Sequence, residues 1–322
     1  MAEANNMLSS DVSRTNPIIK IKKWLIKDIK RNYQLYIFLI PGLVYLFIFD
    51  FLPMYGVQIA FKSFQISKGI WGSPWVGFDH FKRFFKSYQF INILRNTLGI
   101  SLYQLIVGFP APIFLALVLN QVRNKFFKKL VQTVSYAPHF ISVVVICGMI
   151  HLFLSSRNGL VNIILGYFGV DSIFFMGRPE WFWTIYVISG VWVGIGWGSI
   201  IYLAALTSVN TELYDAADID GCNKLHVIWY IDIPAIVPTM VIMLILRMGN
   251  MMDVGFQKTF LLQNDLNLPA SEVISTYVYK VGLVGSQYSY STAIGFFNNV
   301  VNYILVVLAN KVARSVSEVS LW

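Results

Sequence analysis

The residue types that carry enzyme chemistry are present in this chain, but their spacing does not fit a catalytic or metal site. The four histidines form no metal-ligand pair at helical spacing. They are His80, His139, His151 and His226. Neither the G-x-x-x-x-G-K-[ST] motif of a P-loop nor the G-x-S-x-G elbow of a hydrolase is present. The sequence therefore predicts a chain that is not an enzyme and that holds no metal or other cofactor.

The most informative polar segment is residues 211–234, which contain five acidic residues and one lysine. The acids are Glu212, Asp215, Asp218, Asp220 and Asp232. Residues 211–219 suit a short helix, on which Leu213, Ala216 and Ala217 form a small apolar face. Small alanines allow a neighbouring protein to come close, so the pattern is typical of a docking element.

A turn and a second amphipathic helix are predicted after this first helix. Asp220-Gly221 is a turn pattern, because glycine adopts positive φ without a steric penalty. The apolar side of the second helix consists of Leu225, Ile228 and Trp229. We expect Pro234 to mark the start of the next apolar segment. The alternative is a loop that merely lies on the membrane, and the net acidity of the segment disfavours it beside anionic lipid.

A second set of polar and aromatic side chains lies inside or beside apolar stretches, where polar groups are costly and usually face an interior. These candidates for a solute pathway are Trp192, Arg247, Asn250, Asp253, Asn298 and Asn302. Sugars present hydroxyls to amides and apolar ring faces to aromatic residues, so the set suits a sugar. For any single residue, a helix–helix hydrogen bond or ordinary packing is the alternative. Arg247 could pair with a substrate carboxylate, with Asp253 or with a partner chain.

The composition indicates the elements that position these residues. Hydrophobic residues make up 56% of the 322 residues and charged residues only 13%, whereas a soluble domain carries about 25% charged residues. An integral membrane protein follows. The formal charge of +9 would fit a nucleic-acid partner, but Lys and Arg in cytoplasmic segments explain it, so no nucleic acid is expected.

Six segments contain the roughly 20 mostly apolar residues that a helix needs to cross a bilayer. They lie within residues 33–61, 96–122, 130–156, 181–211, 233–252 and 292–310. We expect the first to be broken by Asp50 and Pro53. With the N-terminus inside, 14 of the 25 Lys and Arg residues lie in inner segments and 9 in outer loops. The fold predicted is an all-α membrane protein with six spans and both termini inside (N-in/C-in).

Two further patterns concern packing. Residues 1–34 are predicted to be a cytoplasmic amphipathic segment, either an interfacial anchor or a helix that packs on a partner, ahead of a six-span domain at 35–322. In the fourth apolar segment, Gly190, Gly194 and Gly198 recur every four residues. Glycine at this spacing permits close helix approach, within the bundle or at a subunit interface.

Residues 211–234 resemble the EAA loop of binding-protein-dependent ABC transporter permeases, whose pattern runs Glu-Ala-Ala-x-x-x-Gly and later Ile-x-Leu-Pro. This chain has Asp215-Ala216-Ala217, then Gly221, then Ile231-Asp232-Ile233-Pro234. Asp replaces Glu at 215 and Ile replaces Leu at 233, and both changes keep the chemical type. Other segments resemble sugar-importer permeases of the polysaccharide branch, often called LplB-like. They are residues 40–43, 53–56, 60–62, 71–77, 275–279 and 317–322.

The resemblance implies the type I fold of ABC importer permeases in a bacterial plasma membrane. It implies a second, different six-span permease, two ATPase subunits that bind ATP and Mg, and an extracellular lipoprotein that delivers an oligosaccharide. The loop would be the coupling element that transmits ATPase closure to the fourth and fifth spans. The residues assigned to this coupling are Asp215, Ala216, Ala217, Asp220, Gly221 and Pro234.

Other functions remain open on the sequence alone. A secondary transporter or channel would work without ATPase partners, but such carriers often show two similar halves and no convincing repeat is present. A membrane-embedded enzyme would need a reactive cluster within the membrane. Within the importer hypothesis, the solute could instead be a peptide or another small nutrient. Export is disfavoured, because the EAA loop belongs to importers.

Overall fold

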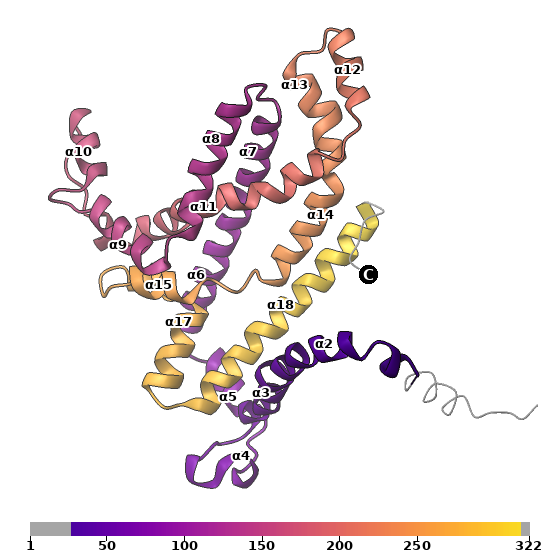
Figure 1. The fold of residues 1–322 in the computed structure, drawn as a ribbon. Helices are drawn as coiled ribbons and strands as arrows, with labels where there is room; N and C mark the ends of the chain where they lie inside the picture. The colour runs from indigo at the N-terminus through magenta and orange to yellow at the C-terminus, as the bar shows by residue number, and fades with distance from the viewer. Residues whose placement is uncertain (1–26, 317–322) are drawn as a thin grey trace, which may run out of the picture. The chain divides into compact units, whose positions relative to one another are not determined.

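The structure is a computed structural model that describes residues 27–316. Five helices in this part of the chain are long and apolar enough to cross a membrane (Figure 1). They are Tyr33–Phe61, Phe90–Asn120, Pro179–Leu206, Lys224–Gly249 and Tyr288–Ser315. Residues 27–316 contain no strand, only an isolated bridge between Lys62 and Trp75. The all-α prediction is confirmed. Most of the amphipathic segment predicted at 1–34, and the motif at 317–322, fall outside the described residues.

The third predicted span is not straight. A bend of 103° separates the helical stretch Lys125–Phe140 from Val143–Phe153. Pro138 lies in a 3₁₀ turn at the end of the first stretch, and the Ser142 hydroxyl accepts the Val145 N–H at 3.4 Å to begin the second. A count of six spans therefore requires that this bent pair cross as one unit, and the N-in/C-in orientation stays a prediction.

Three of the long helices contain a π-helical turn that ends two residues before a proline. The turns are Phe47–Phe51 before Pro53, Gln104–Gly108 before Pro110 and Ile228–Asp232 before Pro234. Proline lacks an N–H and clashes with the carbonyl four residues earlier, and the wider turn absorbs both defects. Two expectations were therefore wrong. The first span is not broken at Asp50 and Pro53, and the fifth begins before Pro234, at Lys224.

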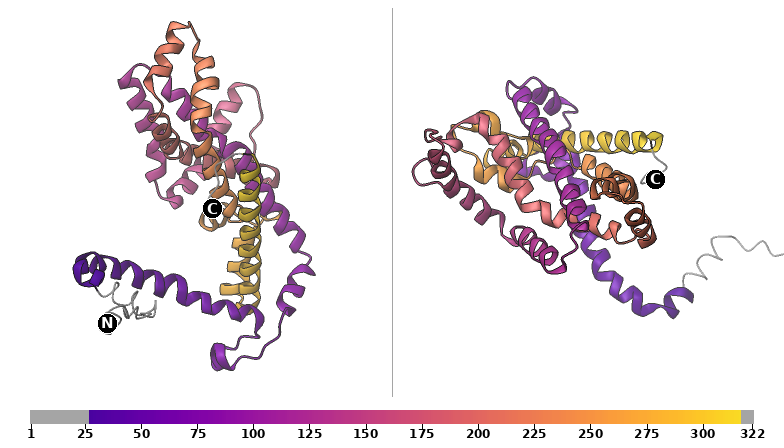
Figure 2. Two further views of the ribbon diagram at one scale, coloured as in Figure 1. Left: turned by 90° about the vertical axis from the view of Figure 1, so that its right-hand side faces the viewer. Right: turned by 90° about the horizontal axis from the view of Figure 1, so that it is seen from above.

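The chain divides into two compact units, Met1–Gln58 and Ile59–Trp322. In the first unit, the described helices include α2 (Tyr33–Leu46) and α3 (Leu52–Met54). In the second, the helices used below are α6 (Phe90–Tyr103), α7 (Pro110–Asn120), α8 (Lys125–Tyr136), α9 (Val143–Phe153), α11 (Pro179–Leu206), α12 (Thr211–Ile219), α13 (Lys224–Val227), α14 (Ile233–Gly249), α15 (Phe256–Leu262) and α18 (Tyr288–Val316). Figure 2 shows α18 as one long uninterrupted helix.

Helix α11 is the central packing element of the second unit, in contact with α6, α7, α8 and α14. Ile113 and Leu119 of α7, Tyr202 of α11 and Ile236 of α14 are buried together in one apolar cluster. Burying a large apolar side chain contributes about 1.5–3 kcal/mol, so this cluster fixes the relative positions of the three helices. These helices carry both candidate sites described next.

Candidate functional site

The polar loop predicted at 211–234 forms a helix–turn–helix. Helix α12 spans Thr211–Ile219, as the sequence predicts. Asn210 caps it, because the Asn210 side-chain oxygen accepts the Glu212 N–H at 3.1 Å. Asn223 caps α13 in the same way, accepting the His226 N–H at 2.9 Å. Each helix thus begins at its own side-chain cap, which gives the corner between them a defined shape.

Gly221 makes the turn between these helices. Its φ is +69°, a conformation that costs most residues energy but not glycine. The Cys222 N–H donates to the Ala217 carbonyl at 2.9 Å and the Gly221 N–H to the Asp218 carbonyl at 3.3 Å. This pair of hydrogen bonds is the Schellman ending of a helix. The predicted bend at Gly221 is confirmed and has a specific hydrogen-bonded geometry.

The outer surface of the loop is more apolar than its acidic sequence suggests. Ile219 is 87% exposed, Leu225 and Trp229 are each 66% exposed, and Leu213 is 52% exposed. Of the two alanines expected on the docking face, Ala216 is exposed but Ala217 is buried at 8%. Ala217 lies one helical turn from Tyr214 on the side that faces the chain's own core. In this conformation Ala216 is available to a partner and Ala217 packs against its own chain, and the assignment of both to a partner contact stays a prediction.

Asp232 joins the loop to the rest of the bundle. Its side chain is completely buried and accepts hydrogen bonds from residues on two other helices. The Tyr214 hydroxyl donates at 2.7 Å from α12, Asn120 Nδ2 at 3.1 Å from the end of α7, and Gln121 Nε2 at 2.7 Å from the next residue. Three donors satisfy a carboxylate that would otherwise be costly to bury. We name Asp232, Tyr214, Asn120 and Gln121 the Asp232 cluster.

The environment of Tyr214 keeps its hydroxyl a donor. Burial, together with donation to Asp232, raises the pKa of Tyr214 to about 12. An exposed ion pair also connects α12 to the segment after α7, with Arg123 Nη2 at 3.4 Å from Asp218 Oδ2. Exposed ion pairs contribute little to stability. The loop is thus held to the end of α7 as well as to the helix that continues into α14.

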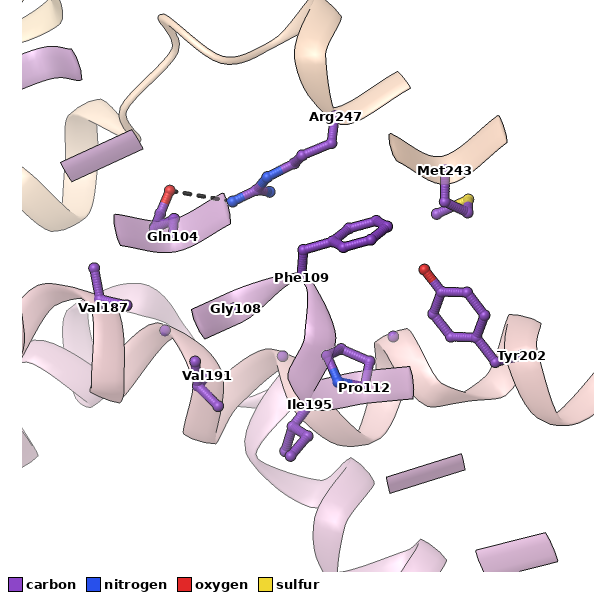
Figure 3. Close-up of a pocket in the computed structure, with 13 residues that line it drawn as sticks. Gln104, Gly108, Phe109, Pro112, Val187, Val191, Ile195, Tyr202, Met243 and Arg247 are labelled. Carbon is purple, nitrogen blue, oxygen red and sulfur yellow. Dashed lines mark hydrogen bonds between the residues drawn. The ribbon is translucent and has the colours of Figure 1, made fainter. Parts of the chain in front are cut away.

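A cavity of about 320 Å³ lies between the Gln104–Gly108 turn, α7, α11 and α14. Figure 3 shows Arg247 reaching toward Gln104 at one end, with Phe109, Tyr202 and Met243 around the other. Gly190, Gly194 and Gly198 line the side formed by α11. A Cβ on Gly198 would stand 3.0 Å from Pro112, whereas one on Gly194 would meet nothing within 4 Å. The glycine stripe therefore permits close α7–α11 packing at Gly198 and leaves open space at Gly194.

Arg247 does not pair with Asp253. Arg247 Nη2 donates to Gln104 Oε1 at 3.1 Å. The Asp253 oxygens instead accept from Asn298 Nδ2 at 2.8 Å and Asn302 Nδ2 at 3.1 Å. The expectation that Asn298 and Asn302 share a helix face is confirmed, and together they hold Asp253 against α18.

The other predicted pathway residues lie in different places. Asn250 lines a smaller cavity of about 70 Å³ together with Arg247 and Asp253. Trp192 lines a separate apolar pocket with Ile150 and Trp181. The structure thus brings Arg247, Asn250 and Asp253 near one another and places Trp192 apart from them. The role of each in transport stays a prediction.

A family model for the "Binding-protein-dependent transport system inner membrane component" matches residues 108–318. The chain belongs to this family. It is 44% identical to the polygalacturonan/rhamnogalacturonan transport system permease protein YteP of Bacillus subtilis strain 168, with 93% of each chain covered. It is 41% identical to protein LplB of the same organism, over 91% of this chain and 92% of LplB. These matches confirm the resemblance inferred from the loop and its position.

Solved structures extend the likeness to the fold of binding-protein-dependent permeases. The chain matches a subunit of a bacterial ABC transporter that imports the acidic polysaccharide alginate, with a TM-score of 0.84 and 43% identity. The match covers 91% of this chain and 99% of that one. A second alginate transporter structure, in complex with a pentasaccharide-bound periplasmic protein, matches equally well at a TM-score of 0.84. The chain is therefore a multi-pass membrane permease with an ABC importer fold, not an enzyme.

Several residues of these sites were not singled out from the sequence. Asp232 was counted only among the acids of the loop, although a carboxylate between Ile231 and Ile233 in a stretch leading into a span indicates a buried polar contact. Its partners could not be found, because Asn120 is 112 positions away in the chain. Gln104 was missed because its partner Arg247 is 143 positions away in the chain. Among residues 27–316, no group of three or more His, Cys, Asp or Glu side chains is placed to hold a metal ion.

Proposed function

We propose that this permease forms, with a second six-span permease, the pathway of an ATP-driven importer for oligosaccharides released from an acidic polysaccharide. The substrate class rests on its relatives. YteP is named for polygalacturonan and rhamnogalacturonan, and the structurally similar transporters import alginate. All of these polymers contain uronic acids, so the shared chemistry is a sugar ring that carries a carboxylate.

The remaining partners follow from the family. A binding-protein-dependent transport system needs a soluble receptor, and one of the similar alginate structures holds a periplasmic protein with bound pentasaccharide. We infer an extracellular lipoprotein in this role for this chain. Two ATPase subunits would bind ATP and Mg and would contact the 211–234 loop. A secondary transporter or channel without ATPase partners is not favoured by any observation on this chain.

The observation that carries the coupling proposal is the combination of an exposed apolar loop surface with the buried Asp232 cluster. Ile219, Leu225 and Trp229 offer area for a partner on the outside of the loop. On the inside, the cluster connects the loop to the end of α7 and to the helix that continues into α14. A displacement of the loop would therefore be transmitted to the second and fifth spans, in addition to the fourth, which leads directly into it.

Transport then follows from a two-state equilibrium. ATP-driven closure of the ATPase pair would favour the loop position that belongs to one pathway conformation, and ATP hydrolysis would release it. Such coupling requires only that the ATPase binds the two conformations with different affinity. Asp215, Ala216 and Asp220 are exposed and remain candidates for the contact, while Gly221 fixes the corner.

The decisive experiment is copurification followed by reconstitution. A tagged chain is extracted in mild detergent and its companions are identified by mass spectrometry. A second six-span permease and an ATPase are expected to copurify. The complex in liposomes should transport the oligosaccharide only when ATP is present on the side of the membrane that carries the ATPase subunits and the receptor is present on the opposite side. Recovery of this chain alone, with uptake that does not need ATP, would contradict the proposal.

A further inference from the structure

Arg247 and Gln104 line one end of the 320 Å³ cavity together with Gly190, and Lys258, which is not itself a lining residue, lies beside Gly190. A Cβ placed on Gly190 would stand 3.3 Å from Lys258 Nζ and 3.9 Å from Gln104 Nε2. Gln104 in turn accepts a hydrogen bond from Arg247. The three side chains come from α15, from the π turn after α6 and from α14. Because residue 190 is glycine, no side chain of its own occupies the space between them.

Neither cation has a carboxylate partner in the part of the chain that the structure describes. The ion pairs found among residues 27–316 involve Arg31, Lys82, Arg123 and Lys280, but not Arg247 or Lys258. Asp253 lines the small adjoining cavity with Arg247, but its oxygens are held by Asn298 and Asn302. Arg247 and Lys258 thus bring two positive charges to this region, whereas the Asp253 carboxylate is already hydrogen-bonded to two asparagines.

Lys258 is in an unusual environment for a lysine. Its Nζ donates to the Tyr186 carbonyl at 2.6 Å and lies 4.4 Å from the centre of the Tyr186 ring. An ammonium group has three donors, so two remain for another ligand. Burial lowers the pKa of Lys258 to about 8, and the nearby Cys147 thiol offsets only part of this effect. A buried cation without an anion is costly, and such residues in membrane proteins mark ligand or ion pathways.

The remainder of the cavity suits a sugar ring. Its volume of about 320 Å³ falls within the range of small-molecule sites, roughly 300–1,000 Å³. Phe109 and Tyr202 offer aromatic surface, and Gly194 leaves that part of the wall open. Guanidinium groups bind carboxylates through paired N–H donors, so Arg247 is well suited to a charged sugar.

We propose that Arg247, Lys258 and Gln104 bind a carboxylate of the oligosaccharide as it passes through the permease, an assignment that rests on the proposed transport of acidic oligosaccharides. Arg247 forms the main ionic contact, Lys258 a second contact from α15, and Gln104 orients Arg247 through its side-chain oxygen. Arg247 is the third residue from the end of α14, which the predicted orientation places toward the outer side. The position would therefore receive solute early in its passage.

The test measures direct binding, so that it does not depend on delivery by the receptor. The importer complex is purified in detergent without receptor, and its affinity for a galacturonate trimer and for the carboxyl-reduced, neutral trimer is determined by calorimetry. The wild type should prefer the acidic trimer. Arg247→Gln and Lys258→Met should each weaken acidic trimer binding about tenfold or more, because each removes a charged hydrogen-bond donor to the carboxylate. Neutral trimer binding should not change.

Controls separate this assignment from loss of the fold and from other occupants. Arg157→Gln alters an exposed arginine outside the cavity and should bind like the wild type. Arg247→Lys keeps the charge but not the paired donors and should fall between the wild type and Arg247→Gln. No preference of the wild type for the acidic trimer, or equal losses for both trimers in Arg247→Gln, would overturn the assignment. So would failure of Arg247→Gln to assemble with the second permease, which would place Arg247 at the subunit interface.

An anionic lipid headgroup could also bind to Arg247 and Lys258, so a separate experiment distinguishes lipid from oligosaccharide. Trimer binding is repeated in nanodiscs of phosphatidylcholine and of phosphatidylglycerol. Equal affinity in both supports a carboxylate site for solute, whereas competition by phosphatidylglycerol that vanishes in Arg247→Gln would assign the position to lipid. Failure of the proposed function itself would be seen differently, as absence of ATP-dependent uptake by the wild type in liposomes.

Discussion

The hydroxyl of Tyr214 donates a 2.7 Å hydrogen bond to the buried carboxylate of Asp232. These residues lie on opposite sides of the loop corner at Gly221, so the bond closes the helix–turn–helix on itself. The same carboxylate accepts from Asn120 and Gln121, which follow the second apolar span. Hydrogen bonds thus connect α12 to the end of α7 and to the residue that precedes α14, and the predictions on coupling rest on this connection.

Tyr214→Phe should uncouple ATP hydrolysis from transport. The substitution removes one of three donors to Asp232 and leaves the ring in place, so we expect a stability loss of about 1.5–3 kcal/mol and a folded complex. The ATP consumed per oligosaccharide imported should rise severalfold, because α12 can move without moving α7. The measurement is the ratio of ATP hydrolysis to uptake in proteoliposomes.

Tyr230, which lies in the same π turn as Asp232, provides the control for this variant. Tyr230 is 78% exposed, and Tyr230→Phe should leave the ratio of ATP hydrolysis to uptake unchanged. Asp232→Leu should be more severe than Tyr214→Phe, because three buried donors lose their acceptor. A normal ratio in Tyr214→Phe, in a complex that assembles at wild-type yield, would show that the Asp232 cluster has no part in coupling.

The effect of a substitution at Gly221 on stability and uptake should depend on whether the new residue tolerates positive φ, and not on the size of its side chain. A Cβ at this position would meet nothing within 4 Å, whereas its φ of +69° disfavours other residues by about 1–2 kcal/mol. Gly221→Ala should therefore lower thermal stability and uptake modestly, and Gly221→Asn less so, since asparagine tolerates this conformation. Gly221→Pro should abolish uptake, because proline fixes φ near −65° and removes the N–H that bonds to Asp218.

Gly166 is the control for these variants, because it also has free space for a Cβ but no positive φ. Gly166→Ala should be neutral in thermal stability and in uptake. If Gly221→Ala and Gly166→Ala behaved alike in both measurements, the turn geometry at Gly221 would not matter for transport.

Local features of the loop could be predicted from the sequence because they depend on neighbouring residues. The bounds of α12, the turn at Gly221 and the shared face of Asn298 and Asn302 all follow from helical periodicity and from the freedom of glycine. The family could be inferred for a related reason, since its motif is short, contiguous and placed before the penultimate apolar segment.

Features set by tertiary packing could not be predicted. The direction in which Ala217 faces, the separation of Trp192 from Arg247 and the partners of Asp232 depend on how helices distant in the chain rotate against one another. The π turns before Pro53, Pro110 and Pro234 were likewise missed. A proline in an apolar run indicates a helix break, and only the surrounding bundle decides whether a wider turn absorbs it instead.

Ile219→Arg should remove the ATPase from the complex without unfolding the permease. Ile219 is 87% exposed in this chain, so a charge there costs little in the isolated fold, but it would be buried against a docked partner. We expect the variant to reach the membrane at normal levels, to retain the second permease and to lose the ATPase during purification. Ile66→Arg, at an isoleucine that is 74% exposed outside the loop, is the matched control and should retain the ATPase. Retention of the ATPase by Ile219→Arg would place the docking surface elsewhere.

The affinity for an acidic oligosaccharide should decrease as the pH rises through the pKa of Lys258. Burial lowers that pKa to about 8, so in the empty site the ammonium loses its proton above this pH and no longer attracts a carboxylate. The titratable groups that face it are Cys147 of α9 and Tyr186 of α11. A bound carboxylate favours the protonated form, which moves the midpoint of the Lys258 titration in the complex above that of the empty site.

Affinity for the galacturonate trimer, measured from about pH 7 to about pH 9.5, should fall in the wild type. Lys258→Arg, which stays charged throughout, should abolish most of that fall. Binding of the neutral trimer should not depend on pH over this range. An equal decline in the wild type and Lys258→Arg would show that Lys258 does not contact the carboxylate.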